Sequence, residues 1–378
     1  MSKQKKAERP ATVSDFELAM ESIAATKLAQ SWDNVGLLVG DRSAIVRRIL
    51  FSIDLTQAVV EEATRANADA LFCYHPPIFR PIHTLVSPGT GMESLVLQCA
   101  RNGIALYSSH TALDAAEGGT NDLIAELCGM QETIPLEYVD DPGKDNVKVV
   151  VFVPGEHADR VANAAFAAGA GVIGDYTHCS YRGKGTGTFF ATEGTNPAIG
   201  KRGRVERVDE LRVELVAPRS RLPAVVAAIR NTHPYEEPAF DLYPLVPPPA
   251  RGIGRVGFLP RKTTLATLAR KLSGRIRATN SSIVGRRSCK VHRAIIIVGA
   301  AGSLPLRCGL GAGDVIVTGE IRHHDALAIA RSGACAIALG HWTSEHPILS
   351  TLVRRLRSEL PGVALKLARS DCEPFARF

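Results

Sequence analysis

The sequence lacks the long apolar run that a membrane-spanning helix requires. Hydrophobic residues make up 45% of the 378 residues, yet no run reaches the roughly 20 apolar residues that cross a bilayer. The N-terminus, MSKQKKAERP, is basic and polar and no apolar segment follows it, so a secretory signal is not expected. We read residues 1–13 as a disordered basic tail and expect a cytoplasmic protein with no membrane partner.

Paired cysteines are also missing. The eight cysteines are scattered along the chain, and none belongs to a CxxC pair. Neither a disulfide framework nor a thiolate zinc site is therefore indicated. Several cysteines lie inside apolar runs such as LFCY and ACAIAL, where a thiol behaves as a small hydrophobic side chain. Such cysteines are typical of proteins of the reducing cytosol.

Acidic residues are absent from one long segment. Between Asp241 and Asp314 there are 13 Lys or Arg and no Asp or Glu, within a chain of net charge +7. The basic segment 251–293 could bind a phosphate-bearing small molecule or nucleic acid. A solvated basic face, with some charges paired to acidic groups elsewhere, explains the pattern equally well. Phe258 is the only aromatic residue there, so a stacking platform for single strands is not indicated.

The remaining pattern divides the chain into three parts. Residues 14–144 and 251–378 alternate short apolar runs, such as ILFSID and AIIIVGA, with amphipathic patterns such as TLATLARKLSGRI. This alternation predicts α/β halves with parallel strands. Residues 145–250 spell β-α-β-β-α-β between turn-rich linkers, DDPGKDN and LVPPPARG, which is the order of a ferredoxin-like (α+β) domain. The predicted fold class is therefore α/β, with two halves forming one platform and a ferredoxin-like domain inserted between them.

Four loops place metal-capable side chains directly after predicted strands. They contain Tyr74-His75, His110 to Asp114, Glu320 to His323-His324, and His341 to Glu345. Imidazole and carboxylate are the ligands of zinc, manganese and iron sites. In a parallel sheet such loops gather at one edge, so the two halves are expected to surround a metal site. Each loop alone is weak evidence, because a lone strand-end histidine is more often a hydrogen-bonded surface residue.

Three other motifs give weaker evidence for a functional site. GIGRVG (252–257) matches the dinucleotide fingerprint as a string, but it lacks the preceding strand and following helix, so we reject that function. GKGTG (183–187) lacks the GK[ST] ending of a phosphate loop, and we expect a tight turn there. HPYEEP (233–238) is interpreted as a structured turn between a helix and the last strand of the middle part. No GxSxG or Cys/His nucleophile pattern occurs.

Taken together, the motifs resemble those of the NIF-three-like family, often labelled GTP cyclohydrolase I type 2-like proteins. The matching elements run in order over nearly the whole chain: SWDNVGLLVG, CYHPPIF, HTALDAAEGGTND, HPYEEPAFDLYPL, GIGRVG, TGEIRHHDALAIA and GHWTSE. The resemblance implies a dinuclear metal centre and a ring-shaped homohexamer. It also fits the three-part division, because longer bacterial members carry a ferredoxin-like insert.

By position, the resemblance assigns the metal ligands as His75, Asp114, His341 and Glu345, with His110 close by. The family usually has two histidines before the proline, whereas this chain has Tyr74 in place of the first. Tyr74 could ligate as a phenolate, leave one ion under-coordinated, or accompany a single metal, so we expect one or two divalent transition metals per chain. Around this pocket the resemblance places a further set: Asp33, Asn34, Glu320, His323 and His324.

The family label implies hydrolytic ring opening of a purine nucleotide, with Glu320, His323 or His324 moving protons. One hypothesis is a metal-dependent hydrolase of a nucleotide or another phosphorylated small molecule. The alternative is a non-catalytic metal-binding scaffold or regulatory protein. The substitution at Tyr74 favours the second hypothesis, whereas retention of the four implied ligands favours the first. No residue pattern here is specific for guanine.

Overall fold

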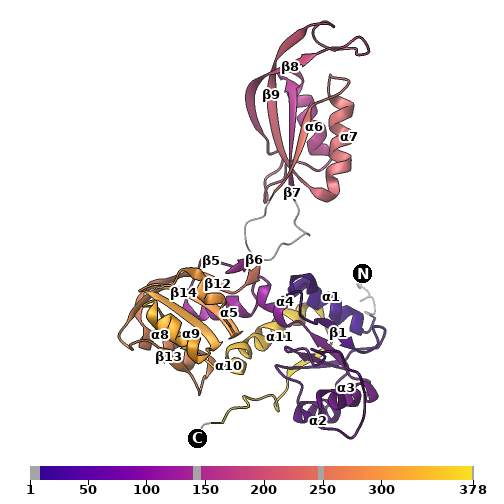
Figure 1. The fold of residues 1–378 in the computed structure, drawn as a ribbon. Coiled ribbons are helices and arrows are strands. Elements are labelled where there is room, and N and C mark those ends of the chain that lie inside the picture. The colour runs from indigo at the N-terminus through magenta and orange to yellow at the C-terminus, as the bar shows by residue number, and fades with distance from the viewer. Residues whose placement is uncertain (1–8, 139–145, 246–250, 377–378) are drawn as a thin grey trace, which may run out of the picture. The chain divides into compact units, whose positions relative to one another are not determined.

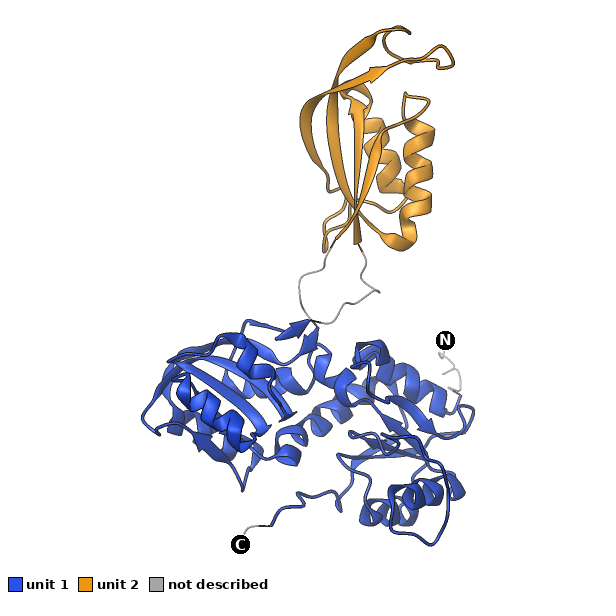
Figure 2. Cartoon of the chain, in the orientation of Figure 1, with its two compact units in different colours: residues 1–140, 249–378 blue, residues 141–248 orange. Residues whose placement is uncertain are grey.

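A computed structural model describes residues 9–138, 146–245 and 251–376 (Figure 1). The chain divides into two compact units, residues 1–140 with 249–378, and residues 141–248 (Figure 2). Within the described ranges, no helix combines the length and apolar character needed to cross a membrane. Residues 1–8 of the expected tail lie outside the described residues. Residues 9–13 are ordered: Thr12 forms a capping box with Asp15 at the start of α1 (Val13–Ile23).

The first unit contains a five-stranded sheet in the order β1-β4-β3-β2-β17. Its strands are β1 (Gly36–Val39), β2 (Arg48–Ser52), β3 (Ala70–Cys73), β4 (Ala105–Ser108) and β17 (Ala364–Leu367). All neighbours run parallel except β1 with β4. One face is covered by α1 and α11 (Pro347–Glu359), the other by α2 (Gln57–Arg65) and α3 (Met92–Arg101).

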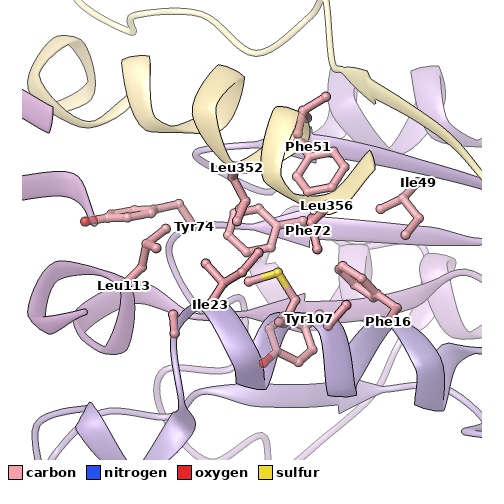
Figure 3. Packing of buried hydrophobic residues seen from close by; sticks show 14 of the residues in the cluster. Phe16, Ile23, Ile49, Phe51, Phe72, Tyr74, Tyr107, Leu113, Leu352 and Leu356 are labelled. Carbon is pink, nitrogen blue, oxygen red and sulfur yellow. The ribbon is translucent and has the colours of Figure 1, made fainter. Parts of the chain in front are cut away.

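Alternation along the strands explains this layering. In β2 and just beyond it, Ile49, Phe51 and Ile53 join the core beneath α1 and α11, where Figure 3 shows Ile49 and Phe51. Leu50 instead packs with α2 and α3. Successive side chains of a strand point to opposite faces, so a strand buried on both faces reads as a continuous apolar run. The predicted parallel strands between helices are therefore present.

A six-stranded sheet forms the rest of this unit, in the order β13-β16-β15-β14-β12-β5. Its strands are β5 (Thr133–Ile134), β12 (Arg255–Thr264), β13 (Ser282–Val284), β14 (Lys290–Ala300), β15 (Asp314–Glu320) and β16 (Cys335–Ala338). Only β14, β15 and β16 run parallel. Helices α5 (Thr120–Cys128) and α8 (Leu265–Ile276) cover one face, and α9 (His323–Arg331) covers the other. The amphipathic pattern predicted for α8 is confirmed: Leu265, Leu268 and Leu272 are buried, and Ile276 is partly buried against the same core.

Each sheet contains one strand that comes from the opposite end of the chain. Strand β17, near the C-terminus, pairs in parallel with β2 of the first sheet, while β5 from the N-terminal part pairs with β12 of the second. A two-stranded ladder, β6 (Glu137–Tyr138) with β11 (Gly252–Ile253), pairs the segments on either side of residues 141–248. The halves are thus interleaved rather than strictly sequential.

The string GIGRVG comprises β11, Gly254 and the start of β12, and no helix follows it directly. Its arginine, Arg255, is 1% exposed and donates to the carboxylate of Asp122 at the start of α5 through Nε and Nη2. The same guanidinium donates to the carbonyls of Gly252, Gly254 and Ala116 at 2.6, 2.8 and 3.2 Å. A buried guanidinium needs such partners, and here they join the loop after α4 (His110–Ala115) to β11 and β12.

The second unit is a four-stranded antiparallel sheet with two helices. Its elements are β7 (Asn146–Pro154), α6 (Ala158–Ala167), β8 (Tyr181–Phe190), β9 (Val205–Pro218), α7 (Leu222–Thr232) and β10 (Phe240–Pro244), in the sheet order β10-β7-β9-β8. GKGTG lies within the edge strand β8 and pairs with β9, so the expected tight turn there is wrong. HPYEEP connects α7 to β10, and its interpretation as a turn is confirmed.

Candidate metal centre

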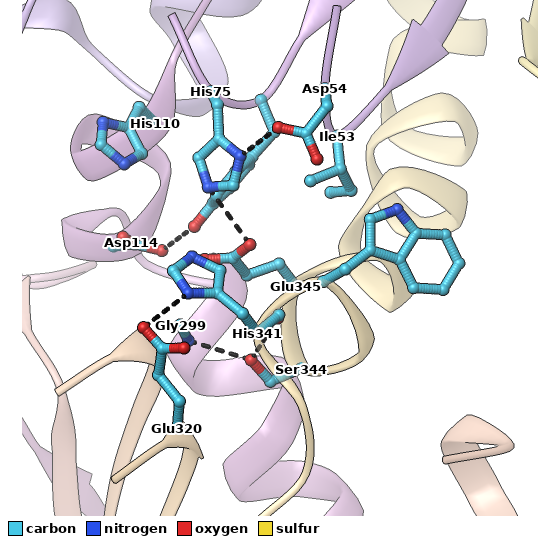
Figure 4. Close-up of polar contacts among 12 residues, drawn as sticks. Ile53, Asp54, His75, His110, Asp114, Gly299, Glu320, His341, Ser344 and Glu345 are labelled. Atoms are coloured by element: carbon cyan, nitrogen blue, oxygen red, sulfur yellow. Dashed lines mark hydrogen bonds and ion pairs between the residues drawn. The ribbon is translucent and has the colours of Figure 1, made fainter. Parts of the chain in front are cut away.

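The carboxyl ends of parallel strands from both sheets surround one group of side chains (Figure 4). From the first sheet, Asp54 follows β2, His75 follows β3, and His110 follows β4 as the first residue of α4. From the second sheet, Glu320 ends β15, and His341 opens the short helix α10 (His341–Glu345) after β16. Loops at the carboxyl ends of such sheets commonly form binding sites.

Three of the expected ligands form one compact cluster. His75, His341 and Glu345 each offer a donor atom, and these atoms lie within 4.8 Å of one another. His75 Nε2 lies 3.3 Å from Glu345 Oε2, and His341 Nε2 lies 3.3 Å from Glu345 Oε1. Donors bound at about 2.0–2.1 Å to one tetrahedral ion are themselves about 3.3 Å apart. The spacing therefore fits a metal.

Each imidazole is oriented by a second carboxylate. His75 Nδ1 lies 2.9 Å from Asp54 Oδ1, and His341 Nδ1 lies 3.2 Å from Glu320 Oε1. A carboxylate at Nδ1 fixes the ring and leaves Nε2 as the donor to a metal. The sequence interpretation included Glu320 but missed Asp54, although that residue directly follows the apolar run ILFSI.

Asp114 contacts Tyr74 and does not belong to the cluster of His75, His341 and Glu345. Its Oδ1 accepts a hydrogen bond from the hydroxyl of Tyr74, which is fully buried. Burial raises the pKa of Asp114 to about 6, although the Tyr74 hydroxyl opposes the rise. Burial and the Asp114 charge hold the pKa of Tyr74 well above its ordinary value. The phenol therefore remains a hydrogen-bond donor at neutral pH.

His110 lies beside the cluster and contacts Asp33, the aspartate of the WDN motif. Its Nδ1 is 2.9 Å from Asp33 Oδ1, and Asp33 also accepts the backbone N–H of Thr111 at 3.1 Å. The His110 and His75 ring centroids are 5.4 Å apart. His110 has a φ of 27°, an uncommon conformation for a residue other than glycine, which often accompanies functional sites.

Two exposed aromatic rings extend from His110 toward solvent. The Trp32 ring lies 6.0 Å from that of His110 and 6.0 Å from that of Phe79. Trp32 is 58% exposed and Phe79 is 50% exposed. The neighbouring Asn34 donates its side-chain amide to the carbonyl of Ile78, which ties the two segments together. The candidate centre therefore has an apolar flank.

The charges of the cluster shift its protonation strongly. Burial would lower the pKa of His75, but Asp54 and Glu345 raise it to about 10. Glu345 raises the pKa of His341 to about 9 against the effect of burial. Burial tends to raise the pKa of Glu345, and the two imidazoles more than offset this, so it stays below its ordinary value. A metal binding here would displace protons from the imidazoles.

The expected proton-transfer residues are not equivalent in the structure. Glu320 contacts His341, as described above. His323 and His324 are exposed at the first turn of α9, with ring centroids 5.5 Å apart, and neither belongs to the metal-capable cluster.

Three cations of the basic segment form contacts within the fold. Arg255 is buried, and Lys271 and Arg275 donate to carbonyls of α5 at 2.9 and 3.1 Å.

Helix α10 is held in place by contacts that sequence patterns did not reveal. Ser344 Oγ accepts the backbone N–H of Gly299 at 2.9 Å, and a Cβ on Gly299 would approach Glu345 Oε1 to 2.3 Å. The C-terminal segment contributes Asp371, which accepts the Trp342 indole N–H at 3.1 Å and the Ile53 N–H at 2.8 Å. That carboxylate links α10 to the end of β2.

One further observation supports a metal. Glu345 is 3% exposed, and His75 Nε2, 3.3 Å from its Oε2, is not in hydrogen-bond geometry. A buried carboxylate needs a cation close by, and here that cation is a protonated imidazole or a metal that replaces its proton. Fold and cluster together define a mixed α/β protein whose two sheets carry a group of side chains able to bind a metal.

Known proteins share this sequence and fold. The family model described as Duf34/NIF3 (NGG1p interacting factor 3) matches residues 11–374. A Mycobacterium tuberculosis protein named GTP cyclohydrolase 1 type 2 homolog is 40% identical over 337 residues, covering 88% of each chain. The protein of that name from Bacillus subtilis is 33% identical over 361 residues, covering 94% of this chain and 95% of its own. A solved Bacillus cereus protein related to NIF3 is 31% identical, with a TM-score of 0.70, and the match covers 98% of this chain and all of that one. The chain belongs to the Duf34/NIF3 family, as its motifs indicated.

Proposed function

We propose that this protein is a metal-dependent hydrolase of a nucleotide or another phosphorylated small molecule. The observation that carries the proposal is the cluster of His75, His341 and Glu345 at the carboxyl ends of two sheets. The name of the relatives, GTP cyclohydrolase 1 type 2 homolog, supports the same class of reaction. When bound, zinc, manganese or iron would supply a Lewis acid that activates water at neutral pH.

The proposed ligands are His75, His341 and Glu345, with Asp114 and His110 beside them. Each oxygen of Glu345 faces one imidazole, and these residues would hold one ion or, as the family resemblance implies, two; the proposal therefore includes a dinuclear centre. Tyr74 is not proposed as a strong ligand, because its hydroxyl already contacts Asp114. The second ion is therefore expected to bind more weakly than the first.

Glu320 is the proposed residue for proton transfer. It is mostly exposed, with 58% of its side chain accessible, and it contacts His341 Nδ1. Such a carboxylate can exchange protons with solvent and hold the imidazole in one orientation. His323 and His324, three and four residues further along the chain, are proposed as a secondary route that acts when substrate is bound.

Trp32 and Phe79 are the proposed contact surface for a flat ring of the substrate. Their exposed rings continue directly from His110, and aromatic faces stack well on heteroaromatic rings. The exposed cations Arg261, Lys262 and Arg286 of segment 251–293 lie near the amino ends of β14 and β16, so a phosphate-bearing partner of that segment is proposed as a separate contact.

The organisation that accompanies this function is also proposed. Residues 14–144 and 251–378 would form one platform, and the topology of residues 145–250 supports a ferredoxin-like insert. A homohexamer in the cytoplasm is proposed from the family resemblance alone. Light scattering on the full chain would test the assembly, and a monomer at micromolar concentration would contradict it.

The decisive experiment is turnover of a nucleotide panel by metal-loaded protein. We expect activity in the wild type, loss of activity in Glu345→Ala, and wild-type activity in Glu359→Ala, an exposed glutamate at the end of α11. Metal content is measured in parallel, so that loss of metal and loss of chemistry are distinguished. If metal-loaded wild type turns over no nucleotide and no other phosphorylated small molecule added to the panel, the hydrolase proposal fails.

A non-catalytic metal-binding scaffold or regulator is the second candidate function. The observation that favours it is Tyr74, which stands where the family usually has histidine and contacts Asp114. In this case the protein would retain metal in the cluster and Glu345→Ala would reduce metal content, yet no nucleotide would be turned over. The same experiment therefore separates the two functions.

A further inference from the structure

The unit formed by residues 141–248 contains a cavity of its own, of about 530 Å³. Cavities of roughly 300–1,000 Å³ are the usual size of small-molecule sites. Two motifs that the metal centre does not use meet there: GKGTG of β8, and the Tyr235, Glu236 and Glu237 part of HPYEEP. The cavity is therefore a candidate ligand site separate from the metal centre.

One wall of the cavity, called its floor below, is the face of the sheet that α6 and α7 do not cover. Val149, Val151 and Val213 pack beneath α6 and α7, so their neighbours Phe152 and Arg212 project from the opposite face. These two are registered partners in β7 and β9, and the Arg212 guanidinium lies 5.9 Å from the Phe152 ring centroid. Both side chains line the cavity.

Glycines keep this floor clear. Residues 183, 185 and 187 are glycines at alternate positions of β8, so they share one face, and residue 183 is the registered partner of Arg212. A Cβ on Gly187 would approach Glu210 Oε2 to 2.3 Å. The spacing that suggested a turn in the sequence instead produces a strip of bare backbone beside a carboxylate.

The connection between β8 and β9 forms a second wall of the cavity, called its roof below. Residues 195 and 197–199 of this connection line the cavity. Between them, the backbone N–H of Asn196 donates to Glu236 Oε1 at 3.0 Å, which ties the roof to the turn after α7. The site is thus bounded by three segments that are separated in sequence and joined by a hydrogen bond.

The lining is largely apolar. Its apolar residues include Phe152, Phe189, Phe190, Pro197, Ile199 and Ala239. A ligand that fills the space must therefore carry an aromatic or aliphatic body, because burial of apolar surface supplies most of the binding free energy of such pockets.

The charges of the lining select the sign of the ligand. Arg212 pairs with Glu214, whose carboxylate also pairs with Lys148, each at 2.9 Å. Glu210 instead accepts the Tyr235 hydroxyl at 2.9 Å and forms no ion pair within the described part of the chain. Burial and the adjacent Glu210 raise the pKa of Tyr235, so the phenol remains a donor. Glu210 is therefore an oriented carboxylate whose charge lacks a counterion.

We propose that this cavity binds a small organic cation, an amine with an aromatic or aliphatic body. The ammonium group would pair with Glu210 next to Gly187, and the body would contact Phe152 and Phe189. Glu236 and Glu237 add negative potential, because the lining then holds three carboxylates against the two cations Lys184 and Arg212. The site is independent of the metal centre, since it lies wholly within residues 141–248.

Calorimetric titration of the full chain with three matched probes tests the proposal. Tryptamine is cationic, tryptophol is neutral and indole-3-propionate is anionic, yet all three carry the same ring. We expect tryptamine to bind about tenfold more tightly than tryptophol, as a charge-assisted hydrogen bond provides, and indole-3-propionate to bind more weakly still. Glu210→Gln should abolish the preference for tryptamine, whereas Asp209→Asn, the adjacent residue on β9 that does not line the cavity, should retain it.

A bulky substitution and a mass measurement complete the test. Ile199→Trp should fill the space and abolish binding of all three probes without altering the far-ultraviolet circular dichroism spectrum. Equal affinity for the three probes, or a preference that survives Glu210→Gln, would overturn the proposal. So would a fall in molecular mass by light scattering in Ile199→Trp, because the cavity would then be a contact between copies of this chain.

Discussion

The hydroxyl of Tyr74 donates to the carboxylate of Asp114, so the residue that replaces the family's usual histidine is hydrogen-bonded to an expected metal ligand. Tyr74 belongs to the core beneath α11 (Figure 3), and its ring centroid lies 5.2 Å from that of His75. A neutral phenol is a poor metal ligand, because the metal must first displace its proton. The contact thus occupies one oxygen of Asp114 without supplying a good ligand.

We expect Tyr74→His to raise the metal that survives dialysis from about one ion per chain toward about two. Imidazole restores a neutral nitrogen donor and frees Asp114 Oδ1. Elemental analysis of wild type and variant, dialysed identically, measures the change.

The matched control for this prediction is Tyr74→Phe. It removes the hydroxyl and keeps the ring that packs in the core, so it should free Asp114 without adding a donor. Metal content in Tyr74→Phe should therefore stay near that of the wild type. Equal metal content in Tyr74→His and wild type would show that position 74 is not a ligand position, or that Tyr74 already serves as an adequate ligand.

Asp54→Asn should weaken metal binding about 10- to 100-fold, because the carboxylate at Nδ1 orients His75 and increases its basicity as a ligand. Competition with a chromophoric chelator measures the affinity. Asp41→Asn is the control: Asp41 is exposed and binds Ser43 in a local turn. An unchanged affinity in Asp54→Asn would mean that the 2.9 Å contact with His75 does not act on the metal.

Arg255→Met should lower the free energy of unfolding by about 3 kcal/mol, the lower end of the effect of removing one partner of a buried ion pair. The lower end applies because the Asp122 side chain is 24% exposed, and water relieves part of the penalty. Urea unfolding followed by circular dichroism measures the loss. Arg261→Met, an exposed site on the same strand, should change it little; a similar loss in both variants would contradict a specific role for Arg255.

The sequence predicted the candidate site better than its supporting contacts. His75, His341 and Glu345, which the structure brings together, each follow an apolar run of strand length, and parallel strands bring such positions to one edge; Asp114 instead contacts Tyr74. Asp54 was missed because its partner is 21 residues away, a separation with no local periodicity. Arg255 was missed for the same reason, since Asp122 is 133 residues distant.

Fold prediction failed where local signals were short or ambiguous. Strands β5 and β17 have two and four residues, too few for an alternation that would assign them to a sheet. GKGTG was misread because closely spaced glycines are typical of turns, whereas here their alternation leaves one face of an edge strand bare. Long amphipathic helices such as α8 were predicted well, because a stripe over three turns is a strong signal.

The contribution of Glu62 to stability should depend on pH. Its carboxylate accepts the backbone N–H groups of Arg369 and Ser370 at 3.0 and 2.8 Å. Burial tends to raise the pKa of Glu62, but these donors and the Ser370 hydroxyl more than offset it and lower the pKa. A carboxyl with a depressed folded-state pKa stabilises the fold above its unfolded value of about 4.3, and this is lost as pH falls through the folded value.

At pH 7, Glu62→Gln should therefore melt about 2 °C below the wild type, and the difference should shrink toward zero near pH 3. Glu61→Gln, the adjacent exposed residue on α2, should show no such trend. Scanning calorimetry at several pH values measures both. A Tm difference that stays constant from pH 7 to pH 3 would show that the effect of Glu62 is not electrostatic.

Residues 141–248 should be removable without loss of the metal centre. The segments on either side already pair, since Tyr138 and Gly252 are registered partners in the β6–β11 ladder. The Cα atoms of such antiparallel partners lie about 4.5–5.5 Å apart. Joining residue 140 directly to residue 249 leaves residues 139, 140 and 249–251 as the connection, and a hairpin loop of about that length closes readily.

We expect the shortened chain to unfold cooperatively and to retain as much metal per chain as the full-length protein, because every residue of the candidate centre lies outside the deleted segment. His341→Ala in the shortened chain should lose metal, which shows that retention still depends on the same cluster. Residues 141–248 expressed alone should also unfold cooperatively, because they have their own core of buried residues from β7, β9, α6 and α7. A shortened chain that aggregates, or one that folds without binding metal, would mean that the inserted unit is needed to build the centre.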